Sequence, residues 1–267
     1  MTLVLLGAGV MGESILSGVL KAGLDPGAVT VVEHRGDRAT EIADRYGVRL
    51  GDVTAVAGAD TVLVAVKPYQ VPVVLGQASQ ALASTTLMLS VAGGLTTAQL
   101  ESWLPAAQPV VRAMPNTPAL VRSGVSAITA GRHATDQHLG AAESLLAAVG
   151  TVVRVPEEQM DAVAAVSGSG PAYVFLVVEA LIEGGVRAGL PRELATALAT
   201  DTLAGSSALL TESGEHPAVL RERVTSPGGT TAAALYALES RGLRAAFSEA
   251  VLANRDRSRE LAAGGGH

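Results

Sequence analysis

Strand and helix patterns alternate along the first 155 residues, and only helix patterns follow Pro156. In the first part, short apolar runs rich in β-branched residues separate stretches with helical spacing. This alternation is typical of a parallel sheet with helices on both faces, so the first part is restricted to an α/β fold. The predicted strands are 2–7, 28–34, 60–68, 85–93, 108–116, 124–131 and 150–156, and the predicted helices are 10–23, 38–47 and about 135–148.

The second part of the chain carries no strand pattern. A change from mixed strands and helices to helices alone marks a domain boundary, which we place at residue 155. The domains are therefore predicted at 1–155 and 156–267, and the terminal GGGH is expected to be a flexible tail. The predicted helices of the second domain are 157–166, 171–189, 192–213, 216–223 and 229–260.

Composition argues against several classes of protein. The net charge is −6 and only 16% of residues are charged, whereas binding of nucleic acid depends on basic residues. The chain has no cysteine, and its five histidines form no cluster with carboxylates, so no metal site is expected. No signal peptide is apparent, and the longest apolar run, 173–182, is shorter than the roughly 20 residues of a membrane span. We expect a cytoplasmic protein that binds neither nucleic acid nor membrane.

A glycine-rich GxGxxG motif lies between the first predicted strand and the first predicted helix. The first glycine permits a tight turn, the second lets a pyrophosphate approach the backbone, and the third allows close packing of helix on strand. The helix N-terminus offers free N–H groups to the phosphates. The motif predicts a Rossmann-type dinucleotide-binding domain. Its residues are Gly7, Ala8, Gly9, Val10, Met11 and Gly12.

The end of the second predicted strand should select the cofactor. Glu33 lies 21 positions beyond Gly12, where an acid binds the ribose 2′-hydroxyl of NADH. His34, Arg35 and Arg38 follow it and can hold the 2′-phosphate of NADPH instead. The two arginines can also belong to a solvated helix start. The pattern favours NADPH and leaves NADH as the alternative.

Six motifs, spread over nearly the whole chain, resemble those of the pyrroline-5-carboxylate reductase family. The resemblance implies NAD(P)H-dependent reduction of 1-pyrroline-5-carboxylate to L-proline, the last step of proline biosynthesis. It also implies a C-terminal domain that forms a homodimer, which can assemble further into a ring of dimers. The motifs are GAGVMG (7–12), AVKP (65–68), VAGG (91–94), VVRAMPNTPA (110–119), AVSGSGPAY (165–173) and VTSPGGTTAAALYALE (224–239).

The resemblance assigns the cofactor site residue by residue. Met114, Pro115 and Asn116 are expected near the nicotinamide. The rest of the cofactor is expected to contact Leu6, Gly7, Ala8, Gly9, Val10, Met11, Gly12, Arg35, Ala65, Val66, Lys67 and Pro68.

The SPGGTT loop that precedes the last predicted helix is expected to bind the substrate, a cyclic imine with a carboxylate. The loop offers backbone N–H groups, a favourable helix dipole and several hydroxyls to an anion. We expect Ser226, Gly228, Gly229 and Thr230 to bind the carboxylate, and the resemblance places the Thr231 hydroxyl at the imine nitrogen. The simpler interpretation makes Ser226 or Thr230 a helix cap.

Other groups are weaker candidates. Glu215 can stabilise the cationic imine or lie on the surface. Ser167 and Ser169 have no histidine or acid spaced to activate them, so we expect them to shape the start of the next helix.

Two alternative functions stay open. A related β-hydroxyacid dehydrogenase would need a catalytic lysine in the helical domain, yet Lys21 and Lys67, the only lysines, are both in the first domain. The chain can also be a dinucleotide-binding module without catalysis. Within imine reduction, six-membered rings are further possible substrates.

The predicted helix 171–189 is apolar around most of its circumference. A helix that is hydrophobic on nearly every side must be surrounded by protein. We predict a homodimer formed by the C-terminal helices, and the alternative is a self-contained bundle with this helix at its centre.

Overall fold

The computed structural model describes residues 1–262, so the predicted tail lies outside the described residues. It contains two compact units. One unit comprises Met1–Ser169 together with the chain from Asn254 onward, and the other comprises Gly170–Ala253. The two units are defined by how compactly the chain packs and do not test the functional domains. The domain boundary at residue 155 therefore stays a prediction.

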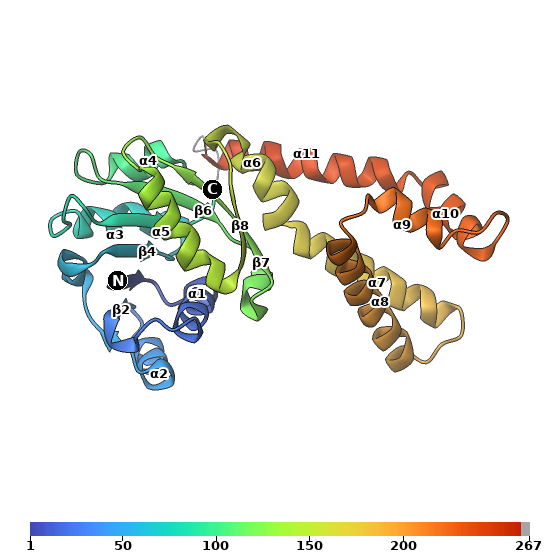
Figure 1. The fold of residues 1–267 in the computed structure, drawn as a ribbon, viewed down its shortest axis with the longest axis horizontal. Helices are drawn as coiled ribbons and strands as arrows, with labels where there is room; N and C mark the ends of the chain where they lie inside the picture. The colour runs from blue at the N-terminus through green and yellow to red at the C-terminus, as the bar shows by residue number, and fades with distance from the viewer. Residues whose placement is uncertain (263–267) are drawn as a thin grey trace. The chain divides into compact units, whose positions relative to one another are not determined.

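The first unit is built on an eight-stranded sheet with the order β3-β2-β1-β4-β5-β6-β7-β8 (Figure 1). The order of its first six strands, 3-2-1-4-5-6, is that of a dinucleotide-binding fold. All neighbouring strands are parallel except β6 and β7, so the predicted parallel sheet is wrong at this one pair. The short connection between them has no crossover helix, and only antiparallel neighbours can be joined in this way. The strands are β1 (Leu3–Leu6), β2 (Val29–Val32), β3 (Arg49–Leu50), β4 (Thr61–Val64), β5 (Leu87–Ser90), β6 (Val110–Met114), β7 (Gly124–Ala130) and β8 (Gly150–Arg154).

Helices of the first unit cover both faces of the sheet, as the alternating pattern predicts. Several start at recognisable caps: the Thr96 side chain accepts a hydrogen bond from Gln99 N–H at the start of α4. The short elements β3, α3 and α4 were not predicted, because so few residues carry too little periodicity to be recognised. The helices are α1 (Val10–Lys21), α2 (Gly36–Tyr46), α3 (Val71–Ala78), α4 (Thr97–Ser102), α5 (Asp136–Leu146) and α6 (Met160–Val163).

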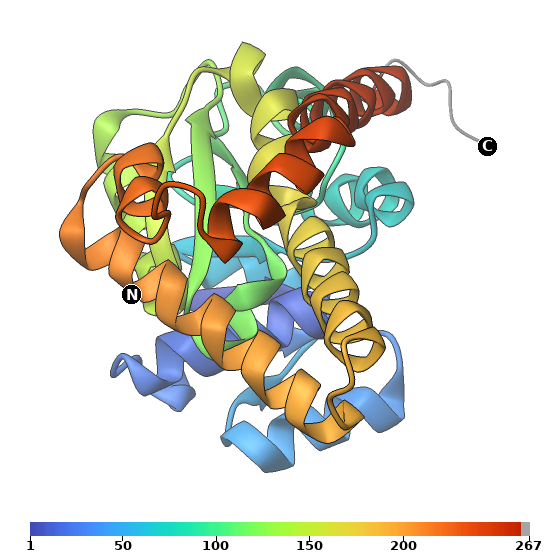
Figure 2. The same ribbon diagram turned by 90° about the vertical axis from the view of Figure 1, so that its right-hand side faces the viewer.

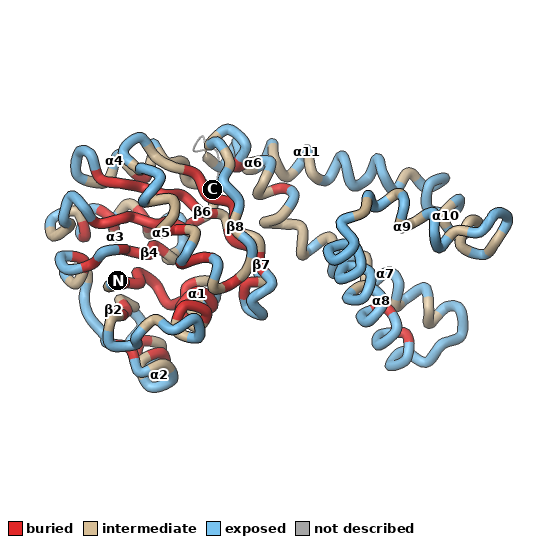
Figure 3. Tube along the Cα trace, in the orientation of Figure 1, coloured by how far each residue is buried: buried red, intermediate tan, exposed pale blue. Residues whose placement is uncertain are grey.

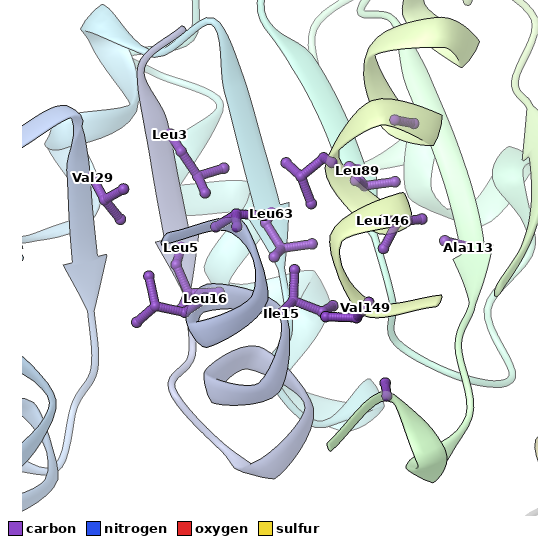
Figure 4. Packing of buried hydrophobic residues seen from close by; sticks show 14 of the residues in the cluster. Leu3, Leu5, Ile15, Leu16, Val29, Leu63, Leu89, Ala113, Leu146 and Val149 are labelled. Atoms are coloured by element: carbon purple, nitrogen blue, oxygen red, sulfur yellow. The ribbon is translucent and has the colours of Figure 1, made fainter. Parts of the chain in front are cut away.

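Two hydrophobic clusters, one on each face of the sheet, hold this unit together. The central strands are buried along their whole length, as Figure 3 shows. On one face, side chains of α1 and α5 such as Ile15, Leu16 and Leu146 pack on the strands (Figure 4). On the other face, α3 contributes Val71 and Leu75. Burial of these apolar side chains, each worth about 1.5–3 kcal/mol, makes the sheet a rigid frame for the loops at its edge.

The second unit is helical. The structure divides the predicted helix 229–260 into α10 and α11, because Gly242 adopts a left-handed turn with φ +74°. Helices α7 and α8 lie side by side (Figures 1 and 2), and an ion pair of 2.6 Å joins Glu183 to Arg192 at their connection. The helices are α7 (Gly170–Arg187), α8 (Arg192–Ser213), α9 (Pro217–Arg223), α10 (Thr230–Ser240) and α11 (Leu243–Ala262), the last of which ends in the first unit.

The second unit has almost no core within one chain. Among its described residues only Ala195 and Ala199 are buried, and Phe175 and Leu176 of α7 are 66% and 65% exposed. The alternative of a self-contained bundle around α7 is therefore wrong, because α7 buries no residue in the single chain. Its apolar surface must be covered by something other than this chain.

The break predicted between helices 157–166 and 171–189 is a π-helical turn, in which Ser169 N–H donates to Ala164 O at 2.9 Å. Residues 157–187 consequently form one helical stretch. By length and composition alone this stretch is apolar and long enough to cross a membrane, contrary to the expectation from residues 173–182. Core or interface helices of soluble proteins meet the same criterion, so this is weak support for a membrane span.

Candidate active site

The glycine-rich turn after β1 lies against the end of β4. Gly7 has φ +94°, and a Cβ there would lie 2.9 Å from the backbone nitrogen of Val66. A Cβ at Gly12 would overlap the Gly7 carbonyl oxygen. Only glycine fits either position, as the motif predicts. Ala65 N–H donates to Leu6 O at 2.8 Å, which joins the two strand ends at the edge where such folds bind dinucleotides.

Gly9 has a different role from the other two glycines. It is the N-cap of α1, with φ −68° and ψ −176°, and no side chain caps the helix. A Cβ at Gly9 would meet no atom within 4 Å, so the space in front of the helix N-terminus is open. The helix start can therefore receive a phosphate, because its first N–H groups have no intrahelical acceptors.

The Glu33 side chain lies beside this turn and is only 3% exposed. Its Oε2 accepts Ala8 N–H at 3.0 Å, and its Oε1 accepts Arg35 N–H at 3.1 Å and Arg35 Nε at 3.2 Å. Burial acts to raise the pKa of Glu33, but these hydrogen bonds outweigh burial and lower the pKa below its ordinary value. Both carboxylate oxygens of the ionised side chain thus already have protein donors, whereas a role in NADH binding requires one to accept a ribose hydroxyl.

Two arginines that follow Glu33 lie in different environments. The Arg35 side chain is 53% exposed and donates through Nε, so its two terminal nitrogens have no partner within residues 1–262. Arg38 is only 16% exposed, and all three of its nitrogens have acceptors in Ala8, Glu13 and Glu41. Hydrogen bonds to Glu41 and Glu13 raise the pKa of Arg38 above its ordinary value. Of the two, only Arg35 has terminal nitrogens without an acceptor in the described chain.

The ion network around Arg38 was missed in the sequence. Glu13 on α1 also accepts Arg45 Nη1 at 2.6 Å and Tyr46 Oη at 3.0 Å, and Arg45 Nη2 donates to Glu41 at 2.6 Å. Burial acts to raise the pKa of Glu13, but bonds from Arg38 and Tyr46 lower it overall. The spacing of Arg38, Glu41 and Arg45 predicts ion pairs on one face of α2. Their shared partner Glu13 could not be predicted in this way, because it lies 25 residues from Arg38 in the sequence.

The AVKP segment follows β4. The predicted strand to Pro68 ends earlier, at Val64, and Pro68 opens a short 3₁₀ turn. Lys67 N–H donates to the Gln70 side chain at 3.2 Å. This turn and the glycine-rich turn leave adjacent strands at the same end of the sheet, so the structure brings these two sets of predicted cofactor residues together.

Asn116 is a predicted cofactor residue whose amide group makes two hydrogen bonds within the chain. Its Oδ1 accepts Val125 N–H at 2.8 Å, and its Nδ2 donates to Ser167 O at 3.1 Å. It is also buried. Met114, at the end of β6, approaches Gly168 so closely that a Cβ there would lie 2.7 Å from the methionine methyl group. In this structure Asn116 therefore anchors the loop between β6 and β7.

The predicted substrate loop begins α10, in the second unit. Gly228 has φ +67°, and Gly229 N–H donates to Ser226 O at 3.0 Å. The N-cap is Gly229, with no side-chain hydrogen bond to the helix start, so neither Ser226 nor Thr230 is the cap that the simpler interpretation required. The hydroxyls of Ser226, Thr230 and Thr231 form no hydrogen bond within the described chain. They are available to a ligand.

Neighbours of this loop have structural partners. Glu215 accepts Arg223 Nη1 at 2.7 Å. A hollow of about 340 Å³ lies between α9, α10 and the start of α11, lined partly by Arg221, Thr225 and Glu239. Ser226, Thr230 and Thr231 do not line this hollow. Within one chain, the predicted substrate residues therefore lie on a loop outside it.

Ser167 and Ser169, which were expected to shape the start of the next helix, both make hydrogen bonds within the chain. Ser167 Oγ donates to Val163 O at 3.1 Å, and Ser169 Oγ accepts Asn254 Nδ2 at 2.9 Å. In the part of the chain that the structure describes, no group of histidines and carboxylates has the arrangement of a metal site.

Comparison with known proteins matches both parts of the chain. Residues 157–261 match the family model "Pyrroline-5-carboxylate reductase dimerisation", and residues 2–94 match "NADP oxidoreductase coenzyme F420-dependent". A pyrroline-5-carboxylate reductase of Mycobacterium leprae is 47% identical, over 96% of this chain and 95% of that protein.

Two solved structures are also similar to the chain. A pyrroline-5-carboxylate reductase from Coxiella burnetii has a TM-score of 0.93 at 38% identity, over 97% of this chain and 98% of that one. The Plasmodium falciparum pyrroline carboxylate reductase, solved with NADP bound, has a TM-score of 0.87 at 29% identity, and the match covers 98% of both chains.

Proposed function

The chain belongs to the pyrroline-5-carboxylate reductase family, and we propose on this basis that it transfers a hydride from NADPH to the C=N bond of 1-pyrroline-5-carboxylate, giving L-proline. The observation that carries the proposal is the match over 96% of the chain, together with a family model that spans residues 157–261 and so includes the SPGGTT loop. The cofactor supplies the hydride, so the protein has to bind, orient and protonate. Oxidation of NADPH that depends on added 1-pyrroline-5-carboxylate tests the function directly. A chain that binds NADPH without such turnover would be the alternative binding module.

We propose that NADPH lies across the carboxyl edge of the sheet. Its pyrophosphate would contact the turn of Gly7 to Gly12, its 2′-phosphate Arg35, and its remaining parts Ala65 to Pro68 and Met114 to Asn116. The open space at Gly9 and the exposed guanidinium of Arg35 support this placement. Residues 1–155 would thus form the nucleotide-binding domain, and residues 156–267 the substrate-binding and dimerisation domain.

We propose that the loop at 226–231 binds the imine. The N–H groups at the start of α10 and the Ser226 hydroxyl would bind the carboxylate, while Gly228 and Gly229 let the ligand approach the backbone. The Thr231 hydroxyl would donate to the imine nitrogen and position it for hydride transfer. The support is that these hydroxyls neither cap the helix nor bond elsewhere in the described chain.

Arg35→Ala is expected to raise the KM for NADPH by roughly tenfold or more and to leave the KM for NADH nearly unchanged. The reason is that a charged hydrogen bond to a phosphate, worth about 1.5–3 kcal/mol, is lost with one cofactor only. Steady-state kinetics with both cofactors measures the difference. Equal effects on the two cofactors would remove Arg35 from this role and restore Glu33 as the selecting residue.

Thr231→Ala is expected to lower kcat/KM for the imine by roughly 10- to 100-fold, because the substrate nitrogen loses its donor in the transition state. The affinity for NADPH should not change. Ser226→Ala, on the same loop, should chiefly raise the KM for the imine by weakening the carboxylate site. Wild-type turnover in Thr231→Ala would contradict the proposed role.

The family's dimerisation domain indicates that the chain forms homo-oligomers. We propose a homodimer in which the partner covers the exposed apolar side chains of α7, and in which dimers can assemble further into a ring. We also propose that the protein is cytoplasmic.

The competing β-hydroxyacid dehydrogenase function lacks support. The lysines, Lys21 and Lys67, lie in α1 and after β4, outside the helical domain where that function requires an acid or base. Turnover of six-membered imines is an added activity that the same assay would detect.

A further inference from the structure

The glycine-rich turn is held from outside by two charged side chains on opposite sides of Ala8. The Ala8 N–H donates to Glu33 Oε2 at 3.0 Å, and the Ala8 carbonyl oxygen accepts Arg38 Nε at 3.0 Å. Glu33 follows β2 and Arg38 lies on α2, so two separate elements fix this one residue.

These two bonds determine the orientation of both peptide groups around Ala8. In a planar trans peptide the C=O and N–H point in opposite directions. Since the Ala8 carbonyl is directed at Arg38, the Gly9 N–H of the same peptide group points away from Arg38. The Gly9 N–H has no hydrogen-bond partner within residues 1–262, and the space beside Gly9 is open.

Arg38 is itself held rigidly. Its Nη1 donates to Glu41 at 2.7 Å, and its Nη2 donates to Glu13 on α1. Because each of its nitrogens has an acceptor and the side chain is largely buried, Arg38 is poorly placed to bind a 2′-phosphate. Arg38 is instead well placed to hold the Ala8 carbonyl group in one orientation.

We propose that Glu33 and Arg38 are positioning residues that hold the Ala8 backbone so that the Gly9 N–H faces the pyrophosphate of the cofactor. This inference rests on the proposed NADPH-dependent function and deepens it. The pyrophosphate is common to NADPH and NADH, so this pair supports binding of both cofactors, whereas Arg35 distinguishes between them. Preorientation of the N–H group removes the cost of ordering the turn when the cofactor binds.

Arg38→Met, which removes every donor of the side chain, should weaken binding of NADPH and NADH by the same factor, about tenfold, because the loss corresponds to one oriented hydrogen bond to a phosphate. The KM for the imine and the kcat at saturating cofactor should be unchanged. Arg38→Lys, which keeps a donor for the Ala8 carbonyl, should retain more affinity than Arg38→Met. Direct titration of each cofactor by fluorescence measures these affinities without requiring turnover.

Arg45→Met is the matched control. Arg45 bonds to Glu13 and Glu41 as Arg38 does, but it makes no contact with the turn. Its loss should lower the melting temperature without changing cofactor affinity. The inference is overturned if Arg38→Met weakens binding of NADPH alone, if it weakens binding of neither cofactor, or if Arg45→Met weakens binding of both equally. Failure of the proposed function would be visible separately, as wild-type protein that binds NADPH but does not reduce the imine.

Discussion

Leu176→Arg is expected to convert the oligomer into inactive monomers with a destabilised helical unit. Leu176 lies on α7, where it is 65% exposed in the single chain, and the whole unit buries only Ala195 and Ala199 among its described residues. A helical unit without a core cannot offset the conformational entropy of its own chain, about 1–2 kcal/mol per residue for the backbone. The missing burial must come from a partner, across an interface of roughly 2,000 Å² or more. An arginine placed there would bury an unpaired charge.

The measurement combines light scattering with activity. Wild-type protein should have at least twice the 26.9 kDa mass of one chain at low micromolar concentration, and the variant should have the mass of one chain and no turnover. Val153→Arg is the control, because Val153 is an exposed apolar residue of the edge strand β8, outside the helical unit. A fully active Leu176→Arg variant of wild-type mass would contradict the interface. Wild-type monomers that bind lipid vesicles would instead assign the apolar helix to a membrane.

Gly9→Ala and Gly12→Ala are expected to separate cofactor binding from stability. A Cβ at Gly9 meets no protein atom, and its φ of −68° is open to any residue, so the folded protein should keep its melting temperature. The added methyl group would occupy the space that the pyrophosphate needs, so NADPH affinity should fall by roughly 10- to 100-fold.

At Gly12 the added Cβ would overlap the Gly7 carbonyl oxygen inside the turn. Overpacking of this kind should cost about 1–3 kcal/mol of stability, which exceeds the modest gain in helix propensity from glycine to alanine. Thermal unfolding and NADPH titration on the two variants measure the separation. Wild-type NADPH affinity in Gly9→Ala would show that the pyrophosphate does not approach this turn.

The fold class could be predicted from the local sequence, which also indicated where the candidate sites lie. Runs such as residues 3–6 and 61–64 were readable as buried strands, because burial on both faces requires continuous apolar residues. The roles of Gly7 and Gly12 could also be predicted, because the tight turn and the close packing leave no space for a Cβ at either position. The SPGGTT loop was predicted to bind the substrate because its glycines and hydroxyls adjoin the start of a helix, and this role stays a prediction.

Which polar groups already have partners within the chain became evident only from the folded structure. Arg35 and Arg38 look equivalent in the sequence, yet Arg38 is occupied by Ala8 and by Glu13, residues 30 and 25 positions away. Asn116 likewise donates a hydrogen bond to Ser167, 51 positions further along. Such pairings form between elements that meet only after folding, so they cannot be predicted from local periodicity. For the same reason the exposed apolar surface of α7 became evident only when the rest of its own chain failed to cover it.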